Sequence, residues 1–253
     1  MSTWIFLRGL TRERRHWGDF PDVFRAELPD AEVLAPDLPG NGGLNALRSP
    51  ASIEAMAEHC RNALREQGAR PPYHLLALSL GAMVATDWAV RHPEELRGCV
   101  LINTSFAGLS PVYRRLRPRQ WTTLLGLALP GRGDAAREAA ILRMTSALAG
   151  DRDRIVRDWS AWRRERPVSP ANALRQLWAA ARFRLPQAPP AVPVLVLAGA
   201  GDALVAPECS RALARRWRAN YAEHPAAGHE LTLDAGPWVA RQVGAWLRLR
   251  EAA

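Results

Sequence analysis

The sequence contains no lysine, and all 34 residues counted as lysine or arginine are arginine. They outnumber the acidic residues and give the chain a net charge of +9. Together with the abundant alanine, this composition indicates the coding bias of a GC-rich genome. Such a bias explains why arginine stands in place of lysine, but it does not explain where along the chain the arginines gather.

Cysteine and long apolar runs are also scarce. Cys60, Cys99 and Cys209 lie far apart and in no Cys-x-x-Cys spacing, so we expect neither a disulfide framework nor a zinc site. No apolar run reaches the roughly 18–20 residues that span a bilayer. The first residues lack the basic start and long apolar region of a signal peptide. We therefore expect a cytoplasmic protein without stable membrane insertion.

Apolar runs with strand character alternate with helix-like spacing over most of the chain. At 253 residues, 48% of them hydrophobic, the sequence is long enough for one large domain with a full core. The expected strands are residues 3–7, 31–35, 73–77, 96–103, 192–198 and 220–224. Strands that alternate with helices predict an α/β fold with a mostly parallel sheet of about six strands and helices on both faces.

This alternation stops between residues 104 and 186. The segment holds only helical patterns broken by proline and glycine, with no strand candidate. We interpret residues 104–186 as an all-helical cap insert, and residues 1–103 and 187–253 as the α/β core.

One short stretch joins a predicted strand to a predicted helix through Ala77-Leu78-Ser79-Leu80-Gly81. A serine at such a sharp turn has a strained backbone, and its neighbours two residues away must be small, as Ala77 and Gly81 are. The turn would hold the Ser79 hydroxyl clear of the sheet, beside the free N–H groups of the following helix. The alternative interpretation is an ordinary serine N-cap.

A nucleophilic serine needs a base, and the base needs an acid that orients it. Asp202 lies in a glycine-bracketed loop after the strand expected at 192–198, where parallel sheets place such groups. His229 lies in a loop after Gly228 and is favoured as the base over His224, which falls at the end of a strand. His16 lies near the first loop, in a position to line a pocket.

The order Ser79, Asp202, His229 is that of the α/β-hydrolases, and the chain resembles that superfamily. It is similar to microbial carboxylesterases with a helical cap, including the carrier-protein methyl ester esterases. The resemblance implies that a small-molecule carboxylic ester is hydrolysed through an acyl-enzyme without a cofactor or metal. In that scheme Ser79 attacks, His229 shuttles the proton and Asp202 orients His229. The segments that carry the resemblance are Arg8-Gly9, residues 37–42, the Ser79 turn, residues 201–205 and Gly228-His229.

The resemblance also implies where the oxyanion is held. One backbone donor would be the N–H of Leu80, and the other the N–H of Leu10, which follows the Arg8-Gly9 pair. Arg8 stands where the family has a histidine, and it is either a brace for the loop or a cation in the pocket that reads an acidic substrate. The family usually has two strands before the one expected at residues 3–7, so we expect about six strands instead of eight.

Single residues distinguish this chain from enzymes of similar layout that catalyse other reactions. Dehalogenases and epoxide hydrolases need an aspartate at position 79, and the hydroxynitrile lyases of similar layout use a lysine that this chain lacks. A thioesterase with the same triad stays open, as does a non-catalytic binding protein on the same fold. No helix-turn-helix, zinc or RNA-binding signature accompanies the positive charge, so no nucleic-acid partner is expected.

The positive charge is concentrated in the predicted insert. Residues 104–186 hold 16 arginines and 6 acidic residues, a local charge of +10, whereas the remainder of the chain carries −1. These arginines are either solvated helix faces or a surface for an acidic acyl carrier protein. The residues expected to line the substrate pocket are Arg8, His16, Trp121, Trp159, Trp162 and Trp178. Those expected on the basic face are Arg114, Arg115, Arg117, Arg119, Arg163, Arg164 and Arg166.

Overall fold

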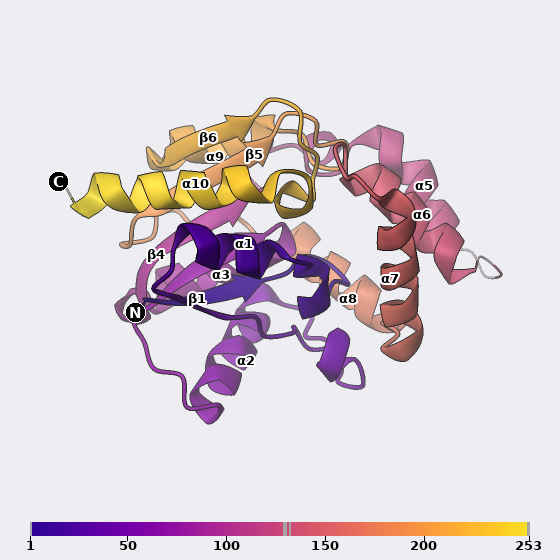
Figure 1. The fold of residues 1–253 in the computed structure, drawn as a ribbon, viewed down its shortest axis with the longest axis horizontal. Coiled ribbons are helices and arrows are strands. Elements are labelled where there is room, and N and C mark those ends of the chain that lie inside the picture. The colour runs from indigo at the N-terminus through magenta and orange to yellow at the C-terminus, as the bar shows by residue number, and fades with distance from the viewer. Residues whose placement is uncertain (1, 129–130, 132, 252–253) are drawn as a thin grey trace.

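One six-stranded parallel sheet forms the centre of the molecule (Figure 1). The computed structural model describes residues 2–128, 131 and 133–251. The strands lie in the order β2-β1-β3-β4-β5-β6, and every neighbouring pair is parallel, which confirms the predicted sheet. Their bounds are β1 (Ser2–Leu7), β2 (Ala31–Leu34), β3 (Tyr73–Leu78), β4 (Leu96–Ile102), β5 (Val194–Gly199) and β6 (Asn220–His224).

The direction in which the sheet grows reverses between β1 and β3. After β1 the chain adds β2 on one side, then returns past β1 and adds β3 to β6 on the other side. In open parallel sheets the crevice that accepts ligands lies beyond the carboxyl ends of the strands at such a reversal. The loop that follows β1 and the turn that follows β3, which contains Ser79, both begin there.

Helices cover both faces of the sheet because successive strand residues point to opposite sides. Trp4 and Phe6 of β1 pack with α1 (Phe20–Glu27) and α10 (Leu231–Glu251) on one face. Ile5 and Leu7 pack on the other face with α2 (Ile53–Glu66), α3 (Leu80–Arg91) and α9 (Glu208–Trp217). All six residues of β3 are buried, as expected for a parallel strand that is covered on both sides.

A local sequence signal marks the start of α2 but not the start of α10. Ser52 caps α2, because its Oγ accepts a hydrogen bond from the Ala55 N–H at 3.2 Å. Helix α10 begins at Leu231 and kinks at Ala235. Pro237 starts the longer second part, where its missing N–H costs nothing. The short first part, directly after the His229 loop, has no comparable sequence signal.

Residues 104–186, called the insert below, lie between β4 and β5 and consist, where described, of helices joined by loops. The insert contains α4 (Val112–Arg115), α5 (Trp121–Ala128), α6 (Asp134–Thr145), α7 (Arg152–Glu165) and α8 (Pro170–Arg182). Short 3-10 helices are η1 (Arg14–Trp17), η2 (Gly42–Leu44), η3 (Pro93–Glu95) and, within the insert, η4 (Pro118–Gln120). An isolated bridge between Ala107 and Arg184 closes its base. Figure 1 shows α5, α6 and α7 beyond the ends of the strands.

Among the described residues, no helix combines the length and the apolar character needed to cross a bilayer.

Candidate active site

Ser79 occupies a strained turn between β3 and α3. Its φ of 58° and ψ of −116° lie in a region that residues with a side chain rarely adopt. Its hydroxyl makes no capping hydrogen bond to α3, so Ser79 is not an ordinary N-cap. Gly81 is required two residues later because a Cβ there would lie 2.3 Å from the carbonyl oxygen of Leu7. The turn thus presses α3 against the end of β1 and leaves the Ser79 hydroxyl free of the helix.

Two hydrogen bonds hold the strained turn to the end of β4. The Ser79 N–H donates to the carbonyl oxygen of Ile102 at 2.9 Å. The Thr104 hydroxyl donates to the carbonyl oxygen of Ser79 at 3.1 Å. With both backbone groups of Ser79 engaged, the surrounding structure maintains the unfavourable dihedral angles.

Asp202 and His229 form a buried pair after β5 and β6. Asp202 Oδ2 lies 2.7 Å from His229 Nδ1, and the two residues are only 1% and 3% exposed. The other carboxylate oxygen, Oδ1, accepts the N–H groups of Leu204 at 2.8 Å and Val205 at 2.9 Å. Since Oδ1 is occupied by the backbone, Oδ2 is the oxygen left for the imidazole.

The pair changes the proton affinity of the imidazole. Burial by itself would lower the pKa of His229, but the charge and hydrogen bond of Asp202 outweigh burial, so the pKa is raised. Glu230, the next residue, also raises the pKa of His229. The imidazole donates from Nδ1 to Asp202, which leaves Nε2 as its base in the neutral form.

Asn103 follows β4 and is hydrogen-bonded to the ends of β5 and of the loop after β6. The sequence did not indicate this role. Its Nδ2 donates to the carbonyl oxygens of Gly228 at 3.0 Å and His229 at 2.9 Å, and its Oδ1 accepts the Gly199 N–H at 3.0 Å. Asn103 has φ of 47°, a conformation that asparagine tolerates better than most residues. The sequence directly after β4 contains no carboxylate, and an asparagine at the end of a strand does not by itself indicate such a role.

Glycines allow the β5 and β6 loops to touch. A Cβ on Gly199 would lie 2.1 Å from the carbonyl oxygen of Ala227, and one on Gly201 would lie 2.4 Å from that of Ala226. Both positions therefore exclude a side chain. The close contact brings the Asp202 loop against the His229 loop.

The loop after β1 reaches Ser79. A Cβ on Gly9 would lie 3.3 Å from the Ser79 Cβ, so the chain passes directly beside the serine. Among the described residues, no hydrogen-bond acceptor is found for the N–H of Leu10. Leu80, the first residue of α3, lies on the other side of Ser79 along the chain. The expected oxyanion donors therefore lie on the two segments that flank the serine.

Arg8 is buried and paired with Glu230. Its Nη2 lies 2.8 Å and 2.7 Å from the two carboxylate oxygens, and its guanidinium stacks 4.7 Å from the ring centre of Trp17. Burial lowers the pKa of Arg8 while Glu230 opposes that shift. Burial would raise the pKa of Glu230, but the charges of Arg8 and Arg12 outweigh it and lower the pKa. The pair links the loop that precedes Leu10 to the residue that follows His229.

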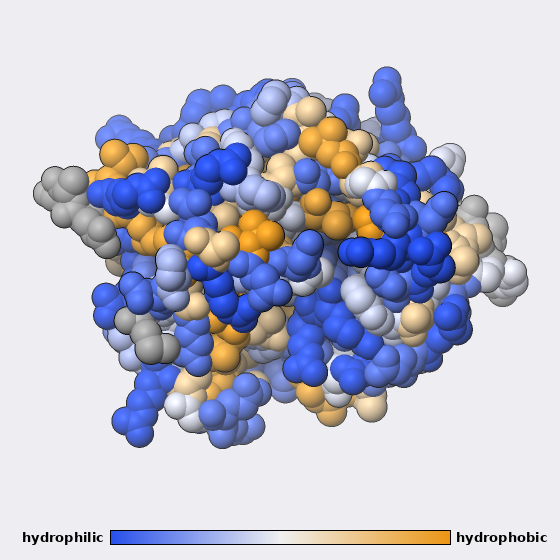
Figure 2. Space-filling view, viewed as in Figure 1, coloured by the Kyte–Doolittle hydropathy of each residue, from blue (hydrophilic) through white to orange (hydrophobic). Residues whose placement is uncertain are grey.

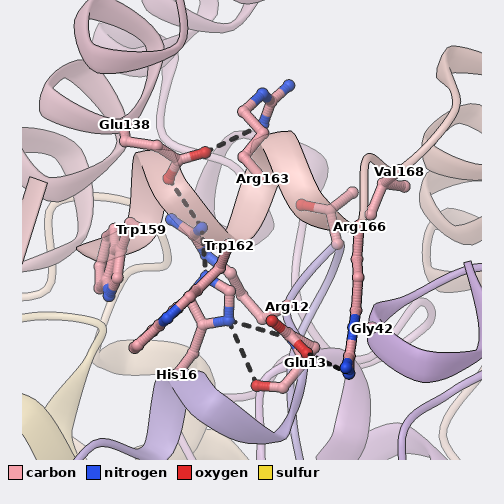
Figure 3. Close-up of a pocket in the computed structure, with 11 residues that line it drawn as sticks. Arg12, Glu13, His16, Gly42, Glu138, Trp159, Trp162, Arg163, Arg166 and Val168 are labelled. Atoms are coloured by element: carbon pink, nitrogen blue, oxygen red, sulfur yellow. Dashed lines mark hydrogen bonds and ion pairs between the residues drawn. The ribbon is translucent and has the colours of Figure 1, made fainter. Parts of the chain in front are cut away.

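His16, Trp159 and Trp162 meet in a small cavity beside this loop (Figure 3). The cavity has a volume of about 20 Å³, room for about one water molecule, and neither Ser79 nor His229 lines it. Arg12 donates to His16 Nε2 at 2.9 Å and stacks 4.2 Å from the ring centre of Trp159. Burial, then the charges of Arg12 and Arg8, place the pKa of His16 well below its usual value, so the ring is neutral.

Trp121 and Trp178, the other two predicted pocket residues, lie at the surface. Trp121 begins α5 and is 46% exposed, whereas Trp178 lies on α8 and is 56% exposed. Neither lines the cavity beside His16. The guanidinium of Arg182 stacks on Trp178 from the same helix.

Several arginines predicted on a basic outer face are partly buried by contacts within the protein. Arg115 donates to the carbonyl oxygens of Ala180 and Ala181, and Arg117 donates to that of Asp202. Arg163 pairs with Glu138, and Arg166 with Glu165. The sequence could not separate Arg115, Arg117 and Arg163 from the exposed set, because their partners are backbone groups or lie far away in the chain. The members that remain exposed are Arg114, Arg119 and Arg164.

The imidazole of His224, the alternative base, accepts a hydrogen bond from the backbone of its own loop. Its Nδ1 accepts the N–H of Ala227 at 3.0 Å and stabilises the turn that leads to His229. No contact with Asp202 accompanies this bond among the described residues.

A family model described as the alpha/beta hydrolase family matches residues 4–242. The chain belongs to the alpha/beta hydrolase family. The match spans the sheet, the insert and the loops that carry Ser79, Asp202 and His229.

Individual relatives are distant. The pimeloyl-[acyl-carrier protein] methyl ester esterase of Aromatoleum aromaticum is 28% identical over 228 residues, which cover 79% of this chain and 82% of that protein. The biotin biosynthesis bifunctional protein BioHC of Teredinibacter turnerae is 30% identical over 105 residues, or 41% of this chain. The match spans only 17% of that bifunctional protein. A thermophilic esterase from Thermogutta terrifontis superposes with a TM-score of 0.72 at 25% identity, covering 98% of this chain and 90% of that one.

Proposed function

We propose that the protein is a serine hydrolase that cleaves a carboxylic ester through an acyl-enzyme. The observation that carries the proposal is the buried Asp202–His229 pair, placed on the same edge of the sheet as the strained Ser79 turn. Membership of a hydrolase family and a fold shared with an esterase support this chemistry.

In each half of the proposed reaction His229 acts first as a base and then as an acid. Ser79 Oγ attacks the ester carbonyl carbon while His229 Nε2 takes the hydroxyl proton, and the carbonyl electrons move to oxygen. The N–H groups of Leu10 and Leu80 stabilise that oxyanion. Collapse releases the alcohol, which takes the proton from His229. Water then attacks the acyl-enzyme carbonyl carbon while His229 Nε2 takes its proton, and collapse returns that proton to Ser79 Oγ as the carboxylic acid leaves.

We propose further that the insert acts as a cap on a core formed by residues 1–103 and 187–253. Hydrogen bonds between the insert and two of the proposed catalytic loops support its role as a cap. Arg117 Nη1 donates to the carbonyl oxygen of Asp202 at 2.8 Å, and the Glu230 N–H donates to that of Thr145 at 2.8 Å. A third hydrogen bond, from the Thr11 N–H in the loop after β1 to Gln176 Oε1, is 2.9 Å long.

The test of the hydrolase proposal pairs a probe with a substrate panel. A fluorophosphonate should label the wild type and fail to label Ser79→Ala, and a graded series of nitrophenyl esters and acyl thioesters should separate esterase from thioesterase. The expected loss of kcat/KM in Ser79→Ala is several orders of magnitude. Retention of most activity by a well-folded Ser79→Ala would refute the assignment and favour a binding protein.

A carrier-linked acyl ester is the second candidate substrate. The Aromatoleum relative acts, by its name, on an acyl carrier protein methyl ester, and the insert of this chain carries the whole excess of positive charge. The surface over α7 is hydrophilic (Figure 2), but its exposed arginines, Arg154, Arg157 and Arg164, stand beside the exposed acids Asp153, Asp158 and Glu165. Among the described residues, the exposed arginines of the insert outside α7 are Arg114, Arg119, Arg143, Arg182 and Arg184. An acidic carrier would be attracted to the insert as a whole over distances that salt screens.

Salt dependence tests that candidate. The kcat/KM for a carrier-linked ester should fall steeply between low and high salt, whereas that for a small neutral ester should change little. The matched variant Arg154→Gln/Arg157→Gln/Arg164→Gln should weaken only the carrier reaction. Equal salt responses for both substrates would limit the enzyme to small esters.

A further inference from the structure

Helix α8 buries polar side chains and exposes large apolar ones. Its buried side carries the polar residues Asn172 and Gln176, which are 6% and 0% exposed. Leu174, Leu177 and Trp178 on its other side are 46–66% exposed. A helix that served only to fill space would bury its leucines and expose its amides. The buried amides are therefore explained by the hydrogen bonds that they make.

Gln176 uses both ends of its amide inside the protein. Its Oε1 accepts the Thr11 N–H at 2.9 Å, and its Nε2 donates to Asn41 Oδ1 at 2.8 Å. Asn41, also fully buried, in turn donates from Nδ2 to the carbonyl oxygen of Arg12 at 3.0 Å. Two side-chain amides thus form a continuous bridge between the N–H of Thr11 and the carbonyl of Arg12.

Both ends of the bridge lie on a strained segment of backbone. Thr11 has φ of 56°, an outlier for a β-branched residue, and it directly follows Leu10. Gly9 on the other side of Leu10 lies against Ser79, and the Arg12 N–H bonds back to the Gly9 carbonyl at 3.2 Å. The peptide that bears the Leu10 N–H is therefore held between the serine and the bridge.

We propose that Gln176 and Asn41 are positioning residues for the oxyanion loop, so that the insert completes the oxyanion hole without touching the substrate. Gln176 holds Thr11 in its strained conformation, and Asn41 fixes the Gln176 amide in the orientation that accepts the Thr11 N–H. The inference rests on the proposed role of the Leu10 N–H. It makes oxyanion stabilisation depend on how α8 is seated on the core.

Gln176→Met tests the proposal, because methionine has a similar volume and cannot make either hydrogen bond. Its matched control is Asn172→Leu, one turn earlier on α8, which removes bonds to the Ser49 N–H and the Leu47 carbonyl, both 2.9 Å, in a loop without a proposed catalytic residue. We expect kcat for a nitrophenyl ester to fall about 10–100-fold in Gln176→Met at unchanged KM, less than the loss of a whole oxyanion donor. We expect a change below about threefold in Asn172→Leu.

Two further measurements separate positioning from stability. The affinity for a boronic acid, which forms a tetrahedral adduct with serine, should fall in Gln176→Met in proportion to kcat/KM, whereas the affinity for the carboxylate product should not. Gln176→Glu keeps an acceptor for Thr11 and should recover part of kcat; it also serves if the methionine variant does not fold. Equal losses in the Gln176 and Asn172 variants, or a full-rate Gln176→Met, would overturn the positioning role.

Ser79→Ala is assayed in parallel to keep the two proposals apart. An inactive Ser79→Ala together with a full-rate Gln176→Met refutes only the positioning role. An active Ser79→Ala refutes the proposed function on which it rests.

Discussion

The orientation of one carboxylate decides how the proposed base can work. Asp202 Oδ1 accepts two backbone N–H groups, from Leu204 and Val205, so the residue cannot rotate without losing both. Oδ2 is left to accept the proton on His229 Nδ1. The backbone of the loop thus selects the tautomer of a residue 27 positions later.

Asp202→Asn should therefore slow turnover by roughly 10³–10⁴-fold. The two backbone donors would hold the new amide oxygen, which turns the NH₂ group toward His229 Nδ1 and forces the imidazole proton onto Nε2. Loss of the carboxylate also removes the interaction that raises the His229 pKa, so the acid limb of the kcat/KM profile should move to lower pH. A rate near that of the wild type would mean that the orienting acid lies elsewhere.

Arg8 is expected to act as a brace. Arg8→Met should destabilise the protein by about 3–5 kcal/mol, because Glu230 would remain buried without a partner. Arg8→Met/Glu230→Met should recover most of that loss, as measured by urea unfolding. At permissive temperature, Arg8→Met should lose activity equally on neutral and anionic esters. A loss confined to anionic esters would identify Arg8 as a cation that reads the substrate.

At the scale of elements, α8 shows that hydrophobic spacing does not always tell which side of a helix is buried. The spacing of Leu174, Leu177 and Trp178 is that of a packed helix face, yet these residues face solvent. The buried side is chosen by Asn172 and Gln176, whose partners belong to the core. The continuous hydrophobic run of β3, by contrast, correctly predicts a strand that is buried on both faces, since both of its faces are covered.

The inverted helix predicts an inverted response to mutation. Leu174→Gln should change the free energy of unfolding by less than about 0.5 kcal/mol, because the side chain is 66% exposed. Leu213→Gln on α9, which buries the same side chain completely, should cost about 3–5 kcal/mol. Urea midpoints at constant m-value provide the comparison. A large cost for Leu174→Gln would show that this side of α8 is covered in solution.

At the scale of the whole molecule, a buried carboxylate fastens the helices on one face of the sheet. Glu95 in η3 accepts hydrogen bonds from Arg61 of α2 at 2.6 and 2.8 Å and from the Trp88 indole of α3 at 2.8 Å. The Arg61 hydrogen bonds are the largest influence, and although burial opposes them, the pKa of Glu95 is lowered to about 2.

The lowered pKa predicts how stability depends on pH. The stabilisation from Glu95 is complete above the pKa of about 4.5 that the group has when unfolded, and it is lost as pH falls toward 2. Glu95→Gln should lower stability near pH 7 by on the order of 2 kcal/mol, or about 5 °C in Tm. The difference from the wild type should close between pH 4.5 and 2. A difference that stays constant over this range would assign the effect to packing.

The sequence alone determined the sheet, its strands and the three candidate catalytic positions. Strand and helix periods are local properties, and buried parallel strands show them without interference. Ser79 and Asp202 could be found because small residues beside them mark sharp turns after strands. Gly228 marks His229 in the same way.

Only the tertiary structure decided which residues hold those positions in place. Asn103, Gln176 and Asn41 act through hydrogen bonds to backbone groups that are distant in the chain, and backbone groups leave no mark in sequence. The role of Arg8 depended on Glu230, which lies 222 positions away. A buried polar group is defined by its partner, and the partner is chosen by the packing of the whole chain.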